Sequence, residues 1–448
     1  MKITCSVVAG FVLMIASTVL GTARLDETLQ KASDNASVKD SLVKVVVFLE
    51  NDASRYQVLL AASDQQMNRA TRLKVISSQL RHGMPSNSNI VTQFLQRNSV
   101  TSISRHWIVP SITAEIPASQ LSNLAQLPGI DQIIQDIPLE LVTPVSVSPA
   151  PSQGTIASEL QFLGVPSLWL RGITGKGRLV CNFDTGVDAK HPALAGKWRG
   201  THAPLAASTF SMVHPDTLPY DNAGHGTHTM GIMCGSNGTD SFGVAPGAEW
   251  INAAVIDQGP DLETTISHIL AAFEWALNPD GDTTTTDDVP DVILNSWGLP
   301  TLQPSAIAPC STIFWQAIDN VESAGIVTIF AAGNEGRSGS STIRNPANRA
   351  STPLNSFCVG AIGLDGKIAD FSSRGPSSCD ATQIKPEVVA PGLSIRSSTK
   401  GGGYAYMSGT SMAAPYIAGM VALCRQYNPD ATVEQIKTAF IRAAQDLG

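Results

Sequence analysis

The apolar positions of residues 42–136 alternate between strand and helix periods, which predicts a small mixed unit in this part of the chain. Apolar runs at 43–49, 107–116 and 130–134 are typical of strands. Residues 63–82 and 117–129 instead have helical spacing. Their apolar positions are Met67, Leu73, Ile76 and Leu80 in the first helix, and Leu121, Leu124 and Leu127 in the second. We therefore expect an α+β unit in which two helices cover one face of a sheet.

From residue 157 onward, strand-like runs alternate with helical segments. The expected strands are 178–183, 250–256, 291–295 and 326–331. One helix between the second and third strands carries a single apolar stripe, made of Ile266, Ile269, Leu270, Phe273 and Leu277. This alternation predicts a parallel sheet covered by helices on both faces.

Two further segments separate the chain into parts. Lys2 precedes an apolar run from Val7 to Leu20 that is short for a membrane span, and small residues follow it, so residues 1–23 are interpreted as a secretory signal peptide. The alternative is a retained anchor. Residues 145–156 are rich in Pro and Ser without periodicity and predict an exposed, cleavable linker. The expected parts are therefore 1–23, 24–144, 145–156 and 157–448.

Charge and hydropathy argue against two classes of binding partner. The formal net charge is −8, from 29 Lys and Arg against 37 Asp and Glu, so the chain offers no basic face for a phosphate backbone. No second apolar run is long enough to cross a membrane, which leaves neither nucleic acid nor, after signal removal, a membrane as an expected partner.

The seven cysteines leave six once Cys5 is removed with the signal, which permits up to three disulfides in an exported protein. Cys181, Cys234 and Cys424 lie in apolar runs typical of buried thiols. The better disulfide candidates are Cys310, Cys358 and Cys379, and their pairing stays open.

Three separated segments carry candidate chemistry. Asp184 follows an apolar strand, His225 lies between two glycines, and Ser411 opens an Ala-rich and Met-rich helical run. A serine hydroxyl becomes a nucleophile when a histidine takes its proton, and a carboxylate orients that histidine. In isolation, Asp184 would be better explained as a turn residue, and Ser411 could be a simple helix N-cap; the three motifs together favour the catalytic interpretation. The chain order Asp, His, Ser favours acyl transfer from peptides.

Two neighbouring residues refine this hypothesis. Asn334 follows an apolar strand between glycines, so its carboxamide is a candidate oxyanion donor beside the backbone N–H of Ser411. His228 lies three residues after His225, and the pair also suggests a metal site. No third ligand accompanies them, so His228 is interpreted as a packed residue and no metal residues are assigned.

Together these motifs resemble the subtilisin-like serine peptidases, and within them the bacillopeptidase F branch. The resemblance covers residues from about 157 to the end. The matching segments are 184–188, 191–192, 224–230, 243–247, 295–298, 331–336, 385–387 with 390–392, and 409–415. It implies an endopeptidase that needs no cofactor for chemistry, with Asp184, His225 and Ser411 as catalytic residues and Asn334 in the oxyanion hole.

The resemblance also implies partners. Residues 24–144 would be a small α+β (ferredoxin-like) propeptide, which assists folding, inhibits the enzyme and is removed by self-cleavage between roughly Val142 and Ser158. Polypeptide substrates would bind between two walls, formed by Ser296, Trp297 and Gly298 and by Ala331, Ala332 and Gly333. Arg344 is placed near the base of that pocket, where it would favour an acidic residue directly before the scissile bond. The alternative is a solvated surface arginine.

The chain departs from this family in two places. The loop 235–242 is shorter than some calcium-holding loops, so structural calcium is left open without ligands. The sequence ends at Gly448 where the family continues, which suggests truncation. Among other functions, a serine esterase of the α/β-hydrolase type would need another residue order and Gly-x-Ser-x-Gly around Ser411, which the sequence lacks. A non-catalytic binding module would need a broken triad or a missing oxyanion donor, and the sequence shows neither.

Overall fold

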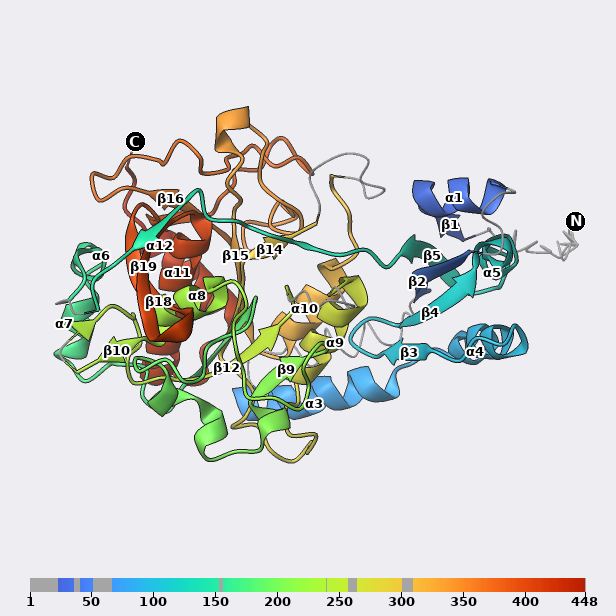
Figure 1. Cartoon of the computed structure of the whole chain (residues 1–448), viewed down its shortest axis with the longest axis horizontal. Helices are drawn as coiled ribbons and strands as arrows, with labels where there is room; N and C mark the ends of the chain where they lie inside the picture. Colours follow the sequence, from blue (N-terminus) through green and yellow to red (C-terminus); the bar gives the residue numbers. More distant parts are fainter. Residues whose placement is uncertain are drawn as a thin grey trace, which may run out of the picture.

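The structure is a computed structural model that describes residues 23–35, 41–50, 67–152, 156–238, 240–256, 264–299 and 309–447. The predicted signal peptide, apart from Ala23, lies outside these ranges, as do Cys5 and the first residues of the helix expected from 63. In Figure 1 a smaller unit, coloured blue to teal, lies beside a larger one that contains the C-terminal half.

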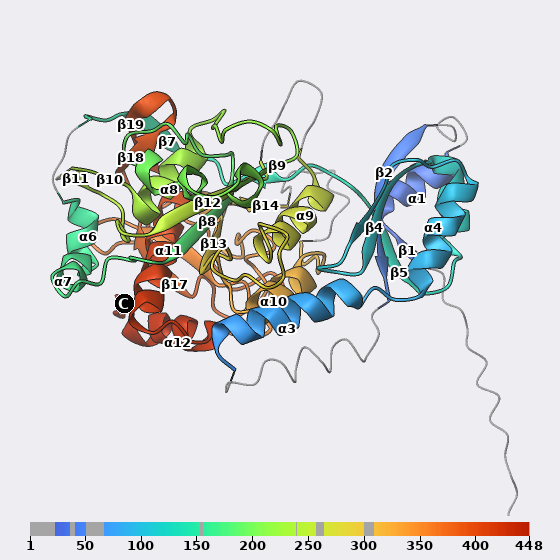
Figure 2. The same ribbon diagram turned by 90° about the horizontal axis from the view of Figure 1, so that it is seen from below.

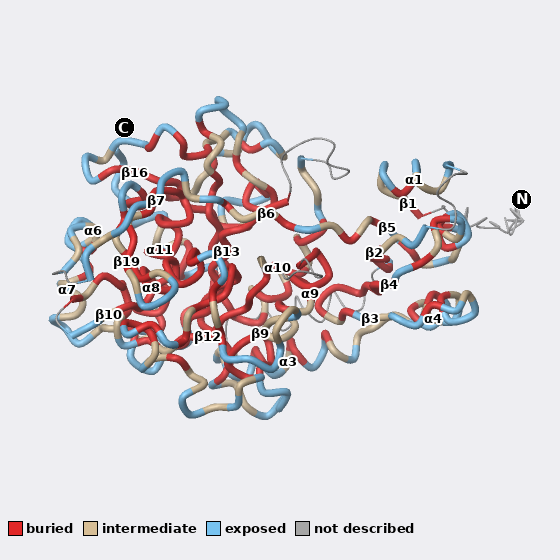
Figure 3. Tube along the Cα trace, in the orientation of Figure 1, coloured by how far each residue is buried: buried red, intermediate tan, exposed pale blue. Residues whose placement is uncertain are grey.

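The larger unit is built on a seven-stranded sheet, as the alternation of elements predicted. The strand order is β17-β16-β15-β13-β8-β12-β9, and every neighbouring pair is parallel. The strands are β8 (Leu179–Asp184), β9 (Thr209–Ser211), β12 (Glu249–Ala254), β13 (Val292–Asn295), β15 (Val327–Ala331), β16 (Cys358–Ile362) and β17 (Val388–Pro391). Figure 3 shows that its central strands are buried.

Helices cover both faces of this sheet because successive strand side chains point to opposite sides. Val180 packs in one apolar cluster with α8 and α11, whereas Cys181 packs in another with α9 and α10. The helices of this unit are α6 (Ser158–Phe162), α7 (Val165–Trp169), α8 (His225–Cys234), α9 (Ile266–Ala276), α10 (Trp315–Ser323), α11 (Thr410–Tyr427) and α12 (Val433–Ala443). No helix among the described residues combines the length and apolar character that a membrane span requires.

The smaller unit is an α+β unit with the strand order β1-β5-β2-β4-β3. One face of its sheet packs on α1, α4 and α5, and the other, through Val46, Phe48 and Ile134, joins the apolar cluster of α9 and α10. Its elements are β1 (Arg24–Leu25), α1 (Glu27–Asp34), β2 (Leu42–Leu49), α3 (Arg69–His82), α4 (Asn87–Arg97), β3 (Ile103–His106), β4 (Ser111–Pro117), α5 (Leu121–Ala125) and β5 (Ile130–Gln135).

Two expectations for this unit were wrong in part. The strand expected over 107–116 forms as β4 only from Ser111, because residues 107–110 are the turn that joins β3 to β4. The helix expected within 63–82 does form from Arg69, but it does not cover the small sheet. Figure 2 shows α3 extending beneath the larger unit, next to α10.

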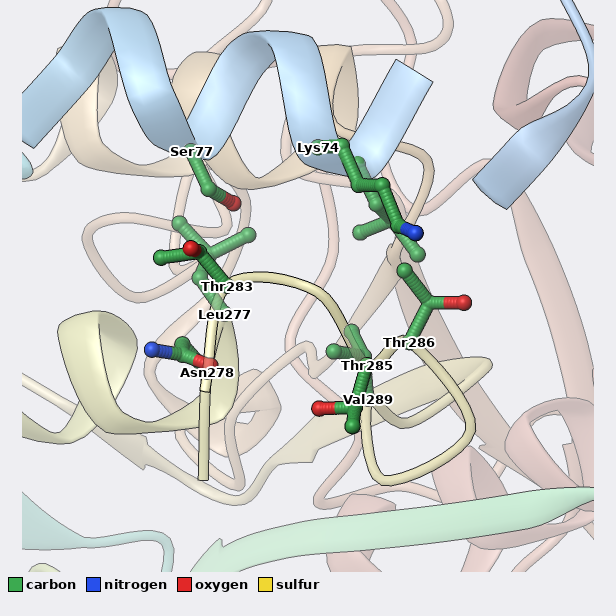
Figure 4. A pocket seen from close by; sticks show the side chains of 9 residues that line it. Lys74, Ser77, Leu277, Asn278, Thr283, Thr285, Thr286 and Val289 are labelled. Atoms are coloured by element: carbon green, nitrogen blue, oxygen red, sulfur yellow. The ribbon is translucent and has the colours of Figure 1, made fainter. Parts of the chain in front are cut away.

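Helix α3 is held there by apolar and polar contacts. Leu73, Ile76 and Leu80 are buried in the cluster of α9 and α10. The Arg69 guanidinium donates to the backbone carbonyls of Val289, Pro290 and Gly325. Figure 4 shows Lys74 and Ser77 of α3 facing the loop after α9 across a small cavity of about 10 Å³. The helix thus belongs to the core of the larger unit as much as to the smaller one.

The segment that joins the two units is not free of structure. Residues 146–149, within the predicted linker, form strand β7 (Ser146–Pro149), which pairs antiparallel with β19 (Gly403–Ser408) next to β18 (Ile395–Thr399). All four residues of β7 are exposed, as expected for a linker. Upstream, β6 (Glu140–Leu141) pairs with β14 (Trp297–Gly298), and a further hairpin joins β10 (Ser236–Asn237) to β11 (Asp240–Ser241).

The predicted classes of disulfide-bonded and free cysteines are confirmed except for Cys358. Cys310 and Cys379 form a disulfide, and Cys181, Cys234 and Cys424 are free thiols. Cys358 was wrongly included among the disulfide candidates, because it lies in the buried strand β16 as a free thiol whose pKa is raised by burial.

Candidate active site

Asp184 and His225 meet at the carboxyl end of β8, an interior strand of the sheet. Both side chains are buried, and Oδ1 of Asp184 lies 2.7 Å from Nδ1 of His225. The backbone N–H of Thr185 and the hydroxyl of Thr229 also donate to the Asp184 carboxylate. His225 is the first residue of α8, directly after Gly224 in the left-handed conformation at φ 85°. The end of β8 therefore positions Asp184, and the start of α8 positions His225.

This pairing determines the free nitrogen of the imidazole. With Nδ1 beside a carboxylate, the proton of the neutral ring resides on Nδ1 and Nε2 is left as an acceptor. Nε2 is buried and, within the described ranges, has no hydrogen-bond partner. The ring is thus oriented to accept a proton at Nε2.

Asp221 is a positioning residue that the sequence analysis missed. Its buried carboxylate accepts hydrogen bonds from Thr185, Ala223, Gly224 and Thr227. These residues belong to the segments that follow Asp184 and that precede and begin α8. Burial raises the pKa of Asp221, although these hydrogen bonds oppose the rise. The sequence feature that could have identified it is an Asp four residues before His225, the histidine that lies between two glycines.

Ser411 lies in the first turn of α11, and its hydroxyl is fully buried against the segment that joins the two units. Its Oγ donates a hydrogen bond to the carbonyl oxygen of Val142 at 2.8 Å. The helix begins at Thr410, one residue after strand β19 ends at Ser408, so the backbone N–H of Ser411 lies in the first helical turn, where N–H groups have no partner four residues back in the helix. Such N–H groups stabilise negative charge that develops nearby.

Asn334 follows β15 and lies beside Thr410 and Ser411. Its Oδ1 accepts hydrogen bonds from both the backbone N–H and the hydroxyl of Thr410, at 2.9 and 3.0 Å. Since the oxygen is occupied, the amide nitrogen points the other way and donates to the carbonyl of Thr143 at 2.8 Å. The carboxamide therefore presents its donor to the peptide that passes Ser411.

The predicted substrate walls hold this same segment by backbone pairing. Strand β14 pairs antiparallel with β6, with Gly298 opposite Glu140 and Trp297 opposite Leu141, and the N–H of Val142 donates to the carbonyl of Ser296. The Trp297 ring itself is buried against Phe314 and Phe330, so its backbone rather than its side chain faces residues 140–142. We call the space between the two predicted walls, where residues 140–142 pair with β14, the groove.

The second wall and Arg344 adjoin this groove. Ala331 ends β15, and Ala332 and Gly333 lead directly to Asn334. Arg344 is not the solvated surface arginine of the alternative interpretation, because its side chain is only 10% exposed. Its guanidinium pairs with Glu335 and reaches Glu140 rather than Val142. The structure therefore places its charge beside a residue two positions before Val142.

His228 is a packed residue. It is fully buried, its Nε2 lies 3.0 Å from the carbonyl oxygen of Ala405, and burial lowers its pKa to about 3. Such a ring is neutral at ordinary pH. In the described part of the chain, no group of three or more His, Cys, Asp and Glu side chains is arranged to hold a metal ion.

Comparisons with known proteins agree with this arrangement. Residues 175–448 match the Subtilase family. Bacillopeptidase F of Bacillus subtilis is 32% identical over 373 residues, which are 78% of this chain and 25% of that protein. Subtilisin E of the same organism is 34% identical over 286 residues, which are 63% of this chain and 64% of that protein. The chain thus spans a quarter of the first relative and just under two thirds of the second.

A solved structure shares the fold. Fervidolysin from Fervidobacterium pennivorans, described as a keratinolytic enzyme related to subtilisin, superposes with a TM-score of 0.61. The match covers 95% of this chain and 60% of that one at 21% sequence identity. The smaller N-terminal unit is thus included in the structural similarity.

Proposed function

Because the chain belongs to the subtilase family, we propose that it is a secreted serine endopeptidase made as a self-processing zymogen. Ser411 attacks the peptide carbonyl, His225 accepts its proton at Nε2, and Asp184 orients the ring and stabilises the imidazolium. Water then hydrolyses the acyl-enzyme by the same route. The observation that carries this proposal is the 2.7 Å pair of Asp184 and His225, with Nε2 free, in a site where Ser411 touches a peptide carbonyl.

Asn334 stabilises the tetrahedral intermediate together with the backbone N–H of Ser411. Thr410 holds the carboxamide oxygen, so the Nδ2 donor is oriented before reaction, and preset donors are the ones that lower the barrier. Loss of one such donor costs about 2.7–4 kcal/mol of transition-state stabilisation.

The N-terminal unit acts as the inhibitor and is removed at the bond between Val142 and Thr143. The Val142 carbonyl is the one in contact with the Ser411 hydroxyl, and pairing of β6 with β14 fixes that register. Attack on this carbonyl carbon forms an ester with Val142, and His225 returns the proton to the Thr143 nitrogen as it leaves. The bond lies at the start of the range expected from the sequence, before the Pro/Ser-rich linker.

Incubation of the purified chain tests both parts of the proposal. We expect a new N-terminus at Thr143 by Edman sequencing, together with cleavage of added polypeptides. Ser411→Ala should remain uncut, and the exposed Ser167→Ala should process like the natural chain. Continued self-processing of Ser411→Ala would refute the nucleophile, and an N-terminus at Pro144 would move the cleaved bond by one residue.

A further inference from the structure

The Arg344 guanidinium is held by Glu335 on one edge and contacts β6 with the other. Its Nε and Nη2 donate to Oε1 of Glu335 at 2.8 and 2.6 Å, and the second oxygen of Glu335 accepts from Ser373 at 3.0 Å. The remaining nitrogen, Nη1, points to β6, where it lies 3.5 Å from the Glu140 carboxylate and 3.4 Å from the Leu141 carbonyl oxygen. Glu335 thus orients the guanidinium, and Nη1 faces the occupant of the groove.

The register of the groove identifies which residue Nη1 meets. Gly298 lies opposite Glu140, Trp297 opposite Leu141, and the Val142 carbonyl touches Ser411. Counting Val142 as the first residue on the N-terminal side of the scissile bond, Glu140 is therefore the third. Backbone pairing in such a groove is independent of sequence, so selectivity must come from side chains along it.

We propose that Arg344 selects an acidic side chain at the third residue before the scissile bond, an inference that rests on the proposed endopeptidase function. Any polypeptide that pairs with β14 in this register places its third residue where Glu140 lies. A carboxylate there accepts a charge-assisted hydrogen bond from Nη1, while a lysine meets a like charge. Both groups of β6 that Nη1 reaches, the Glu140 carboxylate and the Leu141 carbonyl oxygen, precede Val142.

The preference should be modest. Glu335 already balances the charge of Arg344, and the Glu140 side chain remains 34% exposed. Partly exposed pairs of this kind contribute little, so about a 2- to 5-fold advantage of Glu over Gln in kcat/KM is expected. The advantage should shrink as ionic strength rises, because salt screens partly exposed charges.

Three peptides measure this directly. Each copies residues 137–147 and carries Glu, Gln or Lys at the position of Glu140, and each is given to the self-processed enzyme. We expect kcat/KM to fall in the order Glu, Gln, Lys. Equal values for the three peptides would overturn the role of Arg344, whereas a failure to cut any peptide, together with an unprocessed chain, would overturn the proposed function itself.

Two sets of variants assign the preference to its residue. Arg344→Met combined with Glu335→Gln removes both charges, so the Glu335 carboxylate is not left without its cationic partner. The double variant should bring the ratio of kcat/KM for the Glu peptide to that for the Gln peptide close to one. An unchanged ratio would refute the assignment. In the full chain, Glu140→Gln should slow self-processing about 2- to 5-fold, and the exposed Glu115→Gln should leave it unaltered; equal rates for the two would also refute it.

Discussion

The Nδ1 atom of His225 lies 2.7 Å from Oδ1 of Asp184, although 41 residues separate them in the chain. The contact exists because the end of β8 and the first residue of α8 occupy the same edge of the parallel sheet. It leaves Nε2 as the only nitrogen of the ring that can accept a proton. Several consequences of this arrangement and its surroundings can be measured.

Replacing Asp184 with Asn should lower kcat about 10⁴-fold, because an amide stabilises neither the reactive tautomer nor the imidazolium. Steady-state kinetics on a peptide substrate would measure it. Asp188→Asn is the matched control: its carboxylate accepts from the backbone of Lys190 and Gly401 instead of touching His225. A similar loss in both variants would contradict the role assigned to Asp184.

Asp221→Asn should reduce both kcat and stability. The amide replaces one acceptor by a donor in a buried site where Gly224 and Thr227 already donate, at a cost of about 1–3 kcal/mol in the free energy of unfolding. Urea unfolding and kinetics would measure the two effects. The exposed Asp216→Asn should change neither, and a full-activity Asp221→Asn enzyme would remove Asp221 from the positioning residues.

The stability of the uncut Ser411→Ala precursor should fall as the pH is lowered from 7 to 4. His268 lies at the junction of the two units, and its folded pKa is lowered by burial to about 4, below its ordinary value of 6.5. Between these values only the unfolded chain binds the proton, so acid favours unfolding.

His268→Gln tests this prediction, because a glutamine can replace the His268 Nδ1 that accepts from the Thr265 backbone N–H at the start of α9. It should reduce the loss between pH 7 and pH 4 by on the order of 1 kcal/mol, measured by urea unfolding at each pH. An identical pH dependence in both proteins would assign the effect to other groups.

Arg69→Met should weaken the attachment of α3. It leaves the carbonyls of Val289, Pro290 and Gly325 without this donor, and removes an ion-pair partner 3.7 Å from Asp291. We expect the Ser411→Ala precursor to lose about 1–3 kcal/mol in urea unfolding. Arg97→Met, at an exposed position, should stay within about 0.5 kcal/mol; equal losses would show that α3 is not anchored in this way.

Removal of the Cys310–Cys379 disulfide by the double substitution to Ala should cost about 2–4 kcal/mol, since the bond closes a loop with a sequence separation of 69. Thermal unfolding with and without a reductant gives the measurement. The natural chain should lose stability on reduction and the double variant should not. Cys424→Ala, which removes a free thiol, should retain the sensitivity to reductant.

The local pattern of apolar and polar residues was sufficient to predict the main strands of the larger unit and helix α9. Strands such as β8 and β13 are continuous apolar runs because both of their faces are buried, and α9 has one apolar stripe because one side packs on the sheet. The apolar pattern did not predict the turn at 107–110, because its residues are as apolar as those of a strand. For α3, the helical spacing predicted the helix but not which surface it packs against. An apolar stripe specifies that a face is buried, and any apolar surface can bury it.

The amino-acid sequence by itself determined the parallel sheet and the motif positions of Asp184, His225, Asn334 and Ser411, because periodicity and glycine-flanked polar residues are local properties. Only the tertiary structure decided that the segment around Val142 lies against Ser411 and that Arg344 contacts Glu140. It also decided that Asp221 hydrogen-bonds both to the segment after Asp184 and to the start of α8. These relationships join residues far apart in the chain, and each depends on side-chain direction and strand register, which no local pattern specifies.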